Sequence, residues 1–145
     1  MEIYTIGFAG RKASDFFGKL KQVGIKRIID VRLNNKSQLA GFTKKDDLKF
    51  FLKQICQADY IHEPLLAPTD NLLKDYRQKK CSWEDYKSIF NKLMVDREID
   101  NNLDPELFKI PTALLCSEAE ADHCHRRLIV EYLQEKWGDV KIIHL

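Results

Sequence analysis

Hydrophobic and polar positions follow two different periods along this chain, and the order of those periods predicts an α/β fold. Short apolar segments of strand length recur at residues 2–8, 25–32, 59–62, 111–116 and 140–145. Between the first two, apolar side chains three and four positions apart predict a helix from Asp15 to Val23, with Ser14 as its N-cap and Gly24 at its end. A helix between two buried strands implies a right-handed crossover and a parallel sheet.

Longer helical segments continue this pattern. Thr43 is expected to cap an amphipathic helix, and residues 65–107 are expected to form a helical insertion that ends in a charged loop at residues 96–102. Asp122 is expected to cap the last long helix, which Gly138 ends. The sequence therefore predicts one three-layer α/β domain over residues 1–145, with a mainly parallel sheet of about five strands, flanking helices and a helical insertion before the fourth strand.

Composition excludes several classes of protein. With 44% hydrophobic and 32% charged residues, the chain is neither disordered nor fibrous. A net charge of +2 does not by itself indicate nucleic-acid binding, because counterion release needs clustered positive charge. The N-terminus lacks a signal-peptide pattern and no apolar segment approaches the length of about 20 residues that crosses a bilayer. We therefore expect a cytoplasmic protein without membrane contact, whose four cysteines are reduced.

Two groups of polar residues are expected at the carboxyl ends of the strands, where parallel sheets bind ligands. Gly7 begins a turn after the first strand and Arg11 follows it, so this turn is a candidate anion contact, with a plain strand-to-helix turn as the alternative. Asp30 and Arg32 end the second strand on the same side of its pleat. They are candidates for the same ligand site, or for an ion pair that closes the strand.

The turn between the fourth strand and the last helix has the strongest chemical character. Cys116 ends the strand and Cys124 lies in the first turn of the helix, where free amides favour anions and thiolates. On a helical wheel His125 faces the sheet and Arg126 lies beside it. Glu118 lies between the cysteines and could orient His125 or act as a base. These residues predict a site for nucleophilic or acid–base chemistry on an anion.

Other kinds of site remain open at this turn. Zinc would be bound by the two cysteines and one or two histidines, but their spacing lacks the usual ligand pairs. A phosphatase-like loop would have an arginine where Asp122 stands, and a sulfur-transfer site shares only the general layout. Each cysteine taken alone could be a small buried hydrophobic residue. His123 and Arg127 are expected at the surface.

A different class of function is suggested by a row of lysines. The helix after Thr43 carries them on its outer face, at Lys44, Lys45, Lys49 and Lys53. In this alternative the chain is a nucleic-acid or protein-binding module, and the Cys/His/Arg cluster is a structural polar core.

Several motifs resemble those of the domain of unknown function 488 family. They are Thr5–Phe8 with Ser14, Phe16 and Phe17, then Asp30–Arg32, and finally Leu115–Glu118 followed by Cys124–Arg126. The resemblance covers nearly the whole chain. It implies a compact α/β domain whose motif residues are Asp30, Arg32, Cys116, Glu118, Cys124, His125 and Arg126, and it implies no particular reaction or cofactor.

Taken together, these observations predict an enzyme, a hydrolase or transferase, that acts on a small anionic substrate, with phosphate- or nucleotide-bearing molecules as one class. The catalytic candidates are Cys116, Glu118, Cys124 and His125. The anion-binding candidates are Gly7, Arg11, Asp30, Arg32 and Arg126. No metal ligands are assigned, and the alternatives are the binding module and a metal-binding protein that uses the Cys/His cluster.

Overall fold

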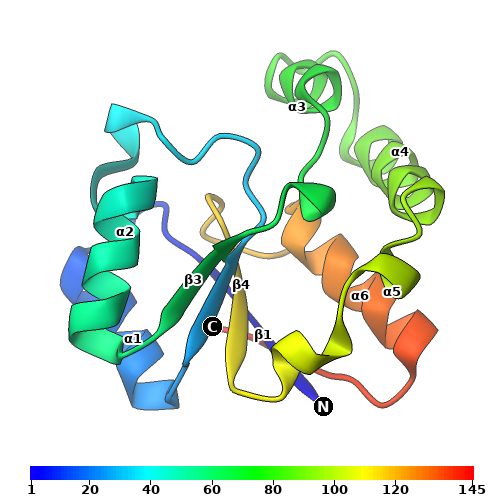
Figure 1. Ribbon diagram of the computed structural model, residues 1–145. Helices are drawn as coiled ribbons and strands as arrows, with labels where there is room; N and C mark the ends of the chain where they lie inside the picture. Colours follow the sequence, from blue (N-terminus) through cyan, green and yellow to red (C-terminus); the bar gives the residue numbers. More distant parts are fainter.

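A computed structural model describes the backbone of residues 1–145 and all side chains except those of residues 38–40. Its sheet consists of β1 (Glu2–Gly7), β2 (Arg27–Asp30), β3 (Asp59–His62), β4 (Thr112–Cys116) and β5 (Lys141–His144). All neighbouring pairs are parallel, and the strand order is β3-β2-β4-β1-β5. The predicted three-layer α/β domain with a parallel sheet is confirmed (Figure 1).

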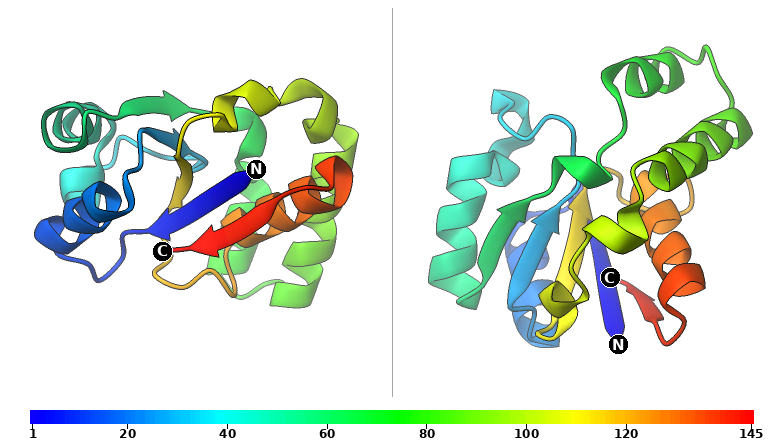
Figure 2. Two further views of the ribbon diagram at one scale, coloured as in Figure 1. Left: turned by 90° about the horizontal axis from the view of Figure 1, so that it is seen from below. Right: turned by 45° about the vertical axis from the view of Figure 1, so that its right-hand side comes forward.

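Helices cover both faces of this sheet. On one face lie α1 (Ala13–Val23) and α2 (Lys45–Phe51), and on the other lie α4 (Trp83–Asp96), α5 (Ile99–Asn102) and α6 (His125–Trp137) (Figures 1 and 2). The remaining helix, α3 (Asp70–Arg77), stands beyond the carboxyl ends of the strands (Figure 1). None of the helices described has both the length and the apolar character needed to span a membrane.

Short helical turns connect the longer elements. They are η1 (Gln38–Thr43), the π-helical turn η2 (Leu52–Cys56), η3 (Pro64–Leu66) and η4 (Pro105–Phe108). The predicted helical insertion before the fourth strand therefore consists of η3, α3, α4, α5 and η4. Its Thr69 and Ser82 side chains cap α3 and α4 by accepting hydrogen bonds from backbone amides.

Two hydrophobic cores lie on the two sides of the sheet. Ile28 packs in the core under α1 and α2, whereas its neighbour Ile29 packs in the core under α4 and α6. This alternation is the pleat of a strand that is buried on both faces. All five residues of β4 are buried, because β4 lies at the centre of the sheet.

Several predicted helix starts are wrong. α1 begins at Ala13 after Lys12, so Ser14 is inside the helix and is not its N-cap. α6 begins at His125 with Cys124 as its N-cap, because the chain first makes a tight turn in which the Cys124 amide donates to the Ala121 carbonyl.

Tertiary contacts explain the other differences from prediction. Thr43 does not cap α2, which begins at Lys45, because both oxygens of Thr43 accept hydrogen bonds from Arg32. The segment expected to be a charged loop instead contains α5, which the fully buried Ile99 anchors in the core. β2 ends at Asp30 because Arg32 folds back onto the Asp30 carboxylate.

Replacement of Phe16 by alanine is expected to destabilise the domain by about 3 to 5 kcal/mol, because the ring is fully buried between α1 and the sheet. Phe50 on α2 is 60% exposed and is the matched control, since Phe50→Ala should change the free energy of unfolding by only about 0.5 kcal/mol. Urea denaturation of the two variants measures the difference, and equal losses would contradict the assignment of the core.

Candidate functional site

A small cavity lies at the carboxyl ends of β2 and β4, beside the first turn of α6. Its volume is about 60 Å³, enough for a few water molecules or a small chemical group. It is lined by residues 32–34, 116–118 and 123–125 together with Pro68, Leu73, Tyr76, Arg77 and Tyr86. The cavity, named here the thiol cavity, therefore contains Arg32 and all four of the predicted catalytic residues in its wall.

The two cysteines of the site are paired. The structure joins Cys116 at the end of β4 to Cys124 at the N-cap of α6 through their sulfur atoms. Cys56 and Cys81 are free. The sequence predicts reduced thiols, whereas in this structure the two sulfurs meet, because the turn that starts α6 brings its N-cap back against the strand end.

Arg126 holds this turn together from inside. Its side chain is 1% exposed, and its Nη1 donates to Cys116 Sγ at 3.0 Å and to the Glu118 carbonyl oxygen. Nη2 donates to the Ala119 carbonyl oxygen at 3.2 Å, and Nε donates to the Thr5 hydroxyl at 3.3 Å. Burial, with a smaller effect of Arg11, lowers the pKa of Arg126 to about 10, so the side chain remains a cation at neutral pH.

Gly7, the last residue of β1, lies against this arginine. A Cβ atom at Gly7 would collide with the Glu118 carbonyl and would lie 2.7 Å from Arg126 Nη1. Glycine is required because the loop after Cys116 passes directly over the end of β1. Arg11, the other residue predicted in this turn, donates to the Leu145 carbonyl oxygen at 2.9 Å and is not in the wall of the thiol cavity.

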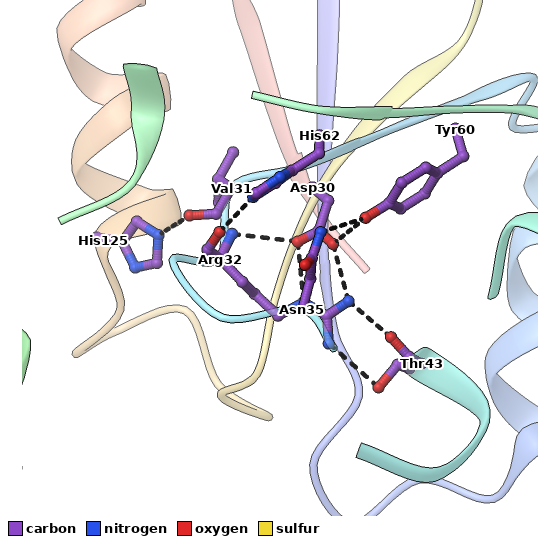
Figure 3. A network of polar contacts seen from close by, with 8 residues as sticks. All are labelled: Asp30, Val31, Arg32, Asn35, Thr43, Tyr60, His62 and His125. Atoms are coloured by element: carbon purple, nitrogen blue, oxygen red, sulfur yellow. Dashed lines mark hydrogen bonds and ion pairs between the residues drawn. The ribbon is translucent and has the colours of Figure 1, made fainter. Parts of the chain in front are cut away.

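His125 is oriented by the backbone. Its Nε2 lies 2.8 Å from the Val31 carbonyl oxygen, and because a carbonyl only accepts, Nε2 carries the proton (Figure 3). The other ring nitrogen, Nδ1, faces Cys124 Sγ at 4.0 Å. Burial lowers the pKa of His125 to about 4, so the ring is neutral at pH 7. The orienting partner expected for His125 was Glu118, and the Val31 carbonyl occupies that place.

Asp30 and Arg32 form a buried ion pair. Asp30 Oδ1 accepts from Arg32 Nε at 2.9 Å and Oδ2 accepts from Arg32 Nη2 at 2.8 Å, and the side chains are 0% and 4% exposed (Figure 3). Arg32 also donates to the hydroxyl and carbonyl oxygens of Thr43. Every guanidinium nitrogen of Arg32 thus has a protein acceptor, which fits the ion-pair alternative.

Three residues of this network were not predicted from the sequence. The Tyr60 hydroxyl donates to Asp30 Oδ2 at 2.5 Å and accepts from Asn35 Nδ2 at 3.0 Å, and burial together with the Asp30 contact raises the pKa of Tyr60 (Figure 3). His62 Nε2 donates to the Arg32 carbonyl oxygen at 2.8 Å. The only signal in the sequence was that Tyr60 and His62 belong to a short predicted strand, which His62 ends.

Aromatic side chains of the helical insertion close the thiol cavity. Tyr76 and Tyr86 line it, and their ring centroids are 4.8 Å apart. Glu118 is exposed at the same wall, where burial and then its carboxylate raise the pKa of Tyr76. His123 is exposed as predicted and also lines the cavity, stacked on Trp83 with ring centroids 5.0 Å apart.

The remaining surface predictions can be placed directly. Arg127 forms an ion pair with Glu131 at 2.8 Å on the outside of α6. Among the side chains that the structure describes, no group of three or more His, Cys, Asp or Glu residues is arranged to hold a metal ion.

Comparison with protein families gives one match. Residues 12–133 match the family described as Domain of unknown function DUF488. The chain belongs to this family. The DUF488 match includes the motif residues from Asp30 to Arg126 and leaves Gly7 and Arg11 outside. Comparisons with curated proteins and with solved structures returned no match.

Substitution of Gly7 by alanine is expected to destabilise the fold by about 1 to 3 kcal/mol, because the loop carrying Glu118 must move away from β1. Gly18→Ala on the exposed face of α1 is the control: its Cβ meets no atom within 4 Å, and it should stabilise the helix by about 0.5 to 1 kcal/mol. Thermal unfolding of both variants tests whether Gly7→Ala lowers the stability and Gly18→Ala raises it.

Stability is expected to fall as the pH drops from about 6.5 towards about 4, because the unfolded chain protonates His125 before the folded protein does. The pKa difference corresponds to about 3 kcal/mol. His125→Gln should flatten this part of the stability profile in urea titrations between pH 4 and pH 7.5. The exposed His123→Gln is the control, and identical profiles for wild type and His125→Gln would contradict the burial of a neutral ring.

Proposed function

We propose that this chain is an enzyme that uses Cys116 as a thiol nucleophile on a small anionic substrate. The observation that carries the proposal is the contact between the Arg126 guanidinium and Cys116 Sγ, 3.0 Å apart at the wall of the thiol cavity. A neighbouring arginine stabilises a thiolate, and the thiolate is the reactive form of cysteine.

The charge balance around Arg126 supports a thiolate at Cys116. Among the residues described, Arg126 forms no ion pair with a carboxylate, and its other acceptors are neutral oxygens. The Glu118 and Glu120 carboxylates act on Arg126 without forming an ion pair with it, so a negative sulfur at 3.0 Å would be the counterion in direct contact with this buried charge. Arg126 is thus a positioning residue that acts through the nucleophile.

The groups around the cavity suit a group-transfer reaction. The Cys116 sulfur would form a bond to the electrophilic atom of the substrate, and the leaving group would depart with its electron pair. The leaving group would take its proton from solvent water, and Glu118, exposed at the cavity wall, is the candidate base for the step that follows. Water or a second acceptor would then take the transferred group from Cys116 and restore the thiolate.

The site would have two states, one in which Cys116 and Cys124 are joined and one in which both are reduced. The pair must be reduced for Cys116 to act, a condition that a cytoplasm maintains. On reduction, Cys124 lies at the N-terminus of α6 with the neutral His125 Nδ1 facing its sulfur at 4.0 Å. Joining of the two sulfurs, as in this structure, blocks the nucleophile.

Alkylation of the reduced protein tests this proposal. Iodoacetamide labelling between pH 5.5 and pH 9, read by mass spectrometry, should give Cys116 a reaction midpoint below the ordinary thiol value of about 8.5. Cys81 is the internal control, because burial and the nearby Asp75 and Asp85 carboxylates raise its pKa. Arg126→Gln should slow Cys116 labelling at pH 7 by about tenfold or more.

The result that would overturn the proposal is a Cys116 that titrates together with Cys81, or one that stays unreactive at every pH in a folded, reduced protein. Omission of the reductant provides a second comparison. Cys116 and Cys124 should then resist labelling while Cys81 is still labelled. Circular dichroism of Arg126→Gln shows whether slow labelling reflects the lost cation or a lost fold.

A further inference from the structure

An open depression adjoins the thiol cavity on the outside. Its volume is about 760 Å³, and it is lined by residues 33–37 together with Lys45, His62 and Arg77. Leu33, Asn34 and Arg77 line both the depression and the thiol cavity, so the two spaces are neighbours. We name this depression the basic groove.

The basic groove has an excess of positive charge. Lys36, Lys45 and Arg77 contribute cations and no Asp or Glu lines it. Among the residues that the structure describes, none of these three side chains forms an ion pair. Three cations around one open depression attract and hold a polyvalent anion.

The arginines that the sequence assigned to anion binding are already occupied. All nitrogens of the Arg32 guanidinium donate to Asp30 or Thr43, and those of Arg126 donate to protein oxygens and to Cys116 Sγ. A substrate anion therefore binds most favourably to cations that have no ion-pair partner in the protein. The basic groove supplies such cations beside the thiol cavity, with which it shares Leu33, Asn34 and Arg77.

Size separates the two spaces into different roles. A volume of about 60 Å³ admits only a reactive group of a few atoms, whereas about 760 Å³ lies in the range of sites that hold whole small molecules. We propose that the basic groove binds the phosphate group of a small organic phosphate monoester, whose reactive end enters the thiol cavity. This inference rests on the proposed function, because it names the substrate class of the same site.

A polynucleotide is disfavoured by the arrangement of the lysines. Of the lysine row on α2 and η2, only Lys45 lines the basic groove. Lys49 and Lys53 line a separate depression that includes Asp59, at the outer edge of β3. The row is therefore not one continuous basic track of the kind that follows a nucleic-acid backbone.

Binding of two phosphate probes to the reduced protein tests the inference. Adenosine 5′-monophosphate and ribose 5-phosphate, measured by isothermal titration calorimetry at low salt, should bind, and adenosine and ribose should bind at least about tenfold more weakly. Lys45→Ala combined with Arg77→Ala should weaken both phosphates by about tenfold or more. Lys49→Ala combined with Lys53→Ala is the matched control and should leave both affinities unchanged.

Protection of the thiol provides an independent measurement. A bound phosphate probe should slow iodoacetamide labelling of Cys116 at least about threefold in wild type, and this protection should disappear in the Lys45→Ala, Arg77→Ala variant. The inference is overturned if neither phosphate binds, if the groove variant binds as well as wild type, or if Cys116 is not protected. It is also overturned if an oligonucleotide binds more tightly and the Lys49, Lys53 variant abolishes that binding.

The outcomes of the two proposals can be separated. If Cys116 is reactive but neither phosphate probe binds, the proposed substrate class is refuted and the proposal of a thiol nucleophile stands. Phosphate binding that depends on Lys45 and Arg77, in a protein whose Cys116 titrates like Cys81, refutes the thiol nucleophile and retains the groove as a binding site. Thermal unfolding of the groove variant, whose substituted side chains lie on the surface, confirms that it is folded.

Discussion

The burial of the Arg126 guanidinium is the constraint on which the site depends. A cation that is 1% exposed must have an acceptor for each of its donors, and the acceptors come from β1, from the end of β4 and from the loop after Cys116. That loop can deliver its carbonyl groups only by passing over Gly7, where no side chain fits. One side chain on α6 thereby links β1, the end of β4 and the loop that leads into the helix.

A second buried network holds the other half of the site. The Asp30–Arg32 pair, with Tyr60 and Thr43 as further partners, closes the end of β2, and the backbone carbonyls of Val31 and Arg32 accept from His125 and His62 (Figure 3). A buried ion pair is weak evidence for stability, because desolvation of the two charges offsets their attraction. Here the network places Leu33 and Asn34 between the thiol cavity and the basic groove.

In the described part of the chain, these two networks separate the cations of the site into buried ones with protein partners and accessible ones without. The buried arginines donate to protein acceptors, so in the proposed function chemistry and anion binding depend on groups that remain accessible from the cavity and the groove. The helical insertion contributes to both spaces, because Tyr76 lines the cavity and Arg77 lines the cavity and the groove. An element that the sequence marked only as core packing is thus part of the site wall.

By itself the sequence determined the layers, the parallel sheet and the turn between β4 and α6, because these depend on hydrophobic period and on local glycine and polar signals. It did not determine the N-caps of α1, α2 and α6. Thr43 accepts hydrogen bonds from Arg32, and Cys124 is joined to Cys116 at the end of β4, and neither contact can be read from the local sequence. Tertiary structure alone decided which cations are free, because that depends on acceptors contributed by other strands. For the same reason it decided that Val31, and not Glu118, orients His125.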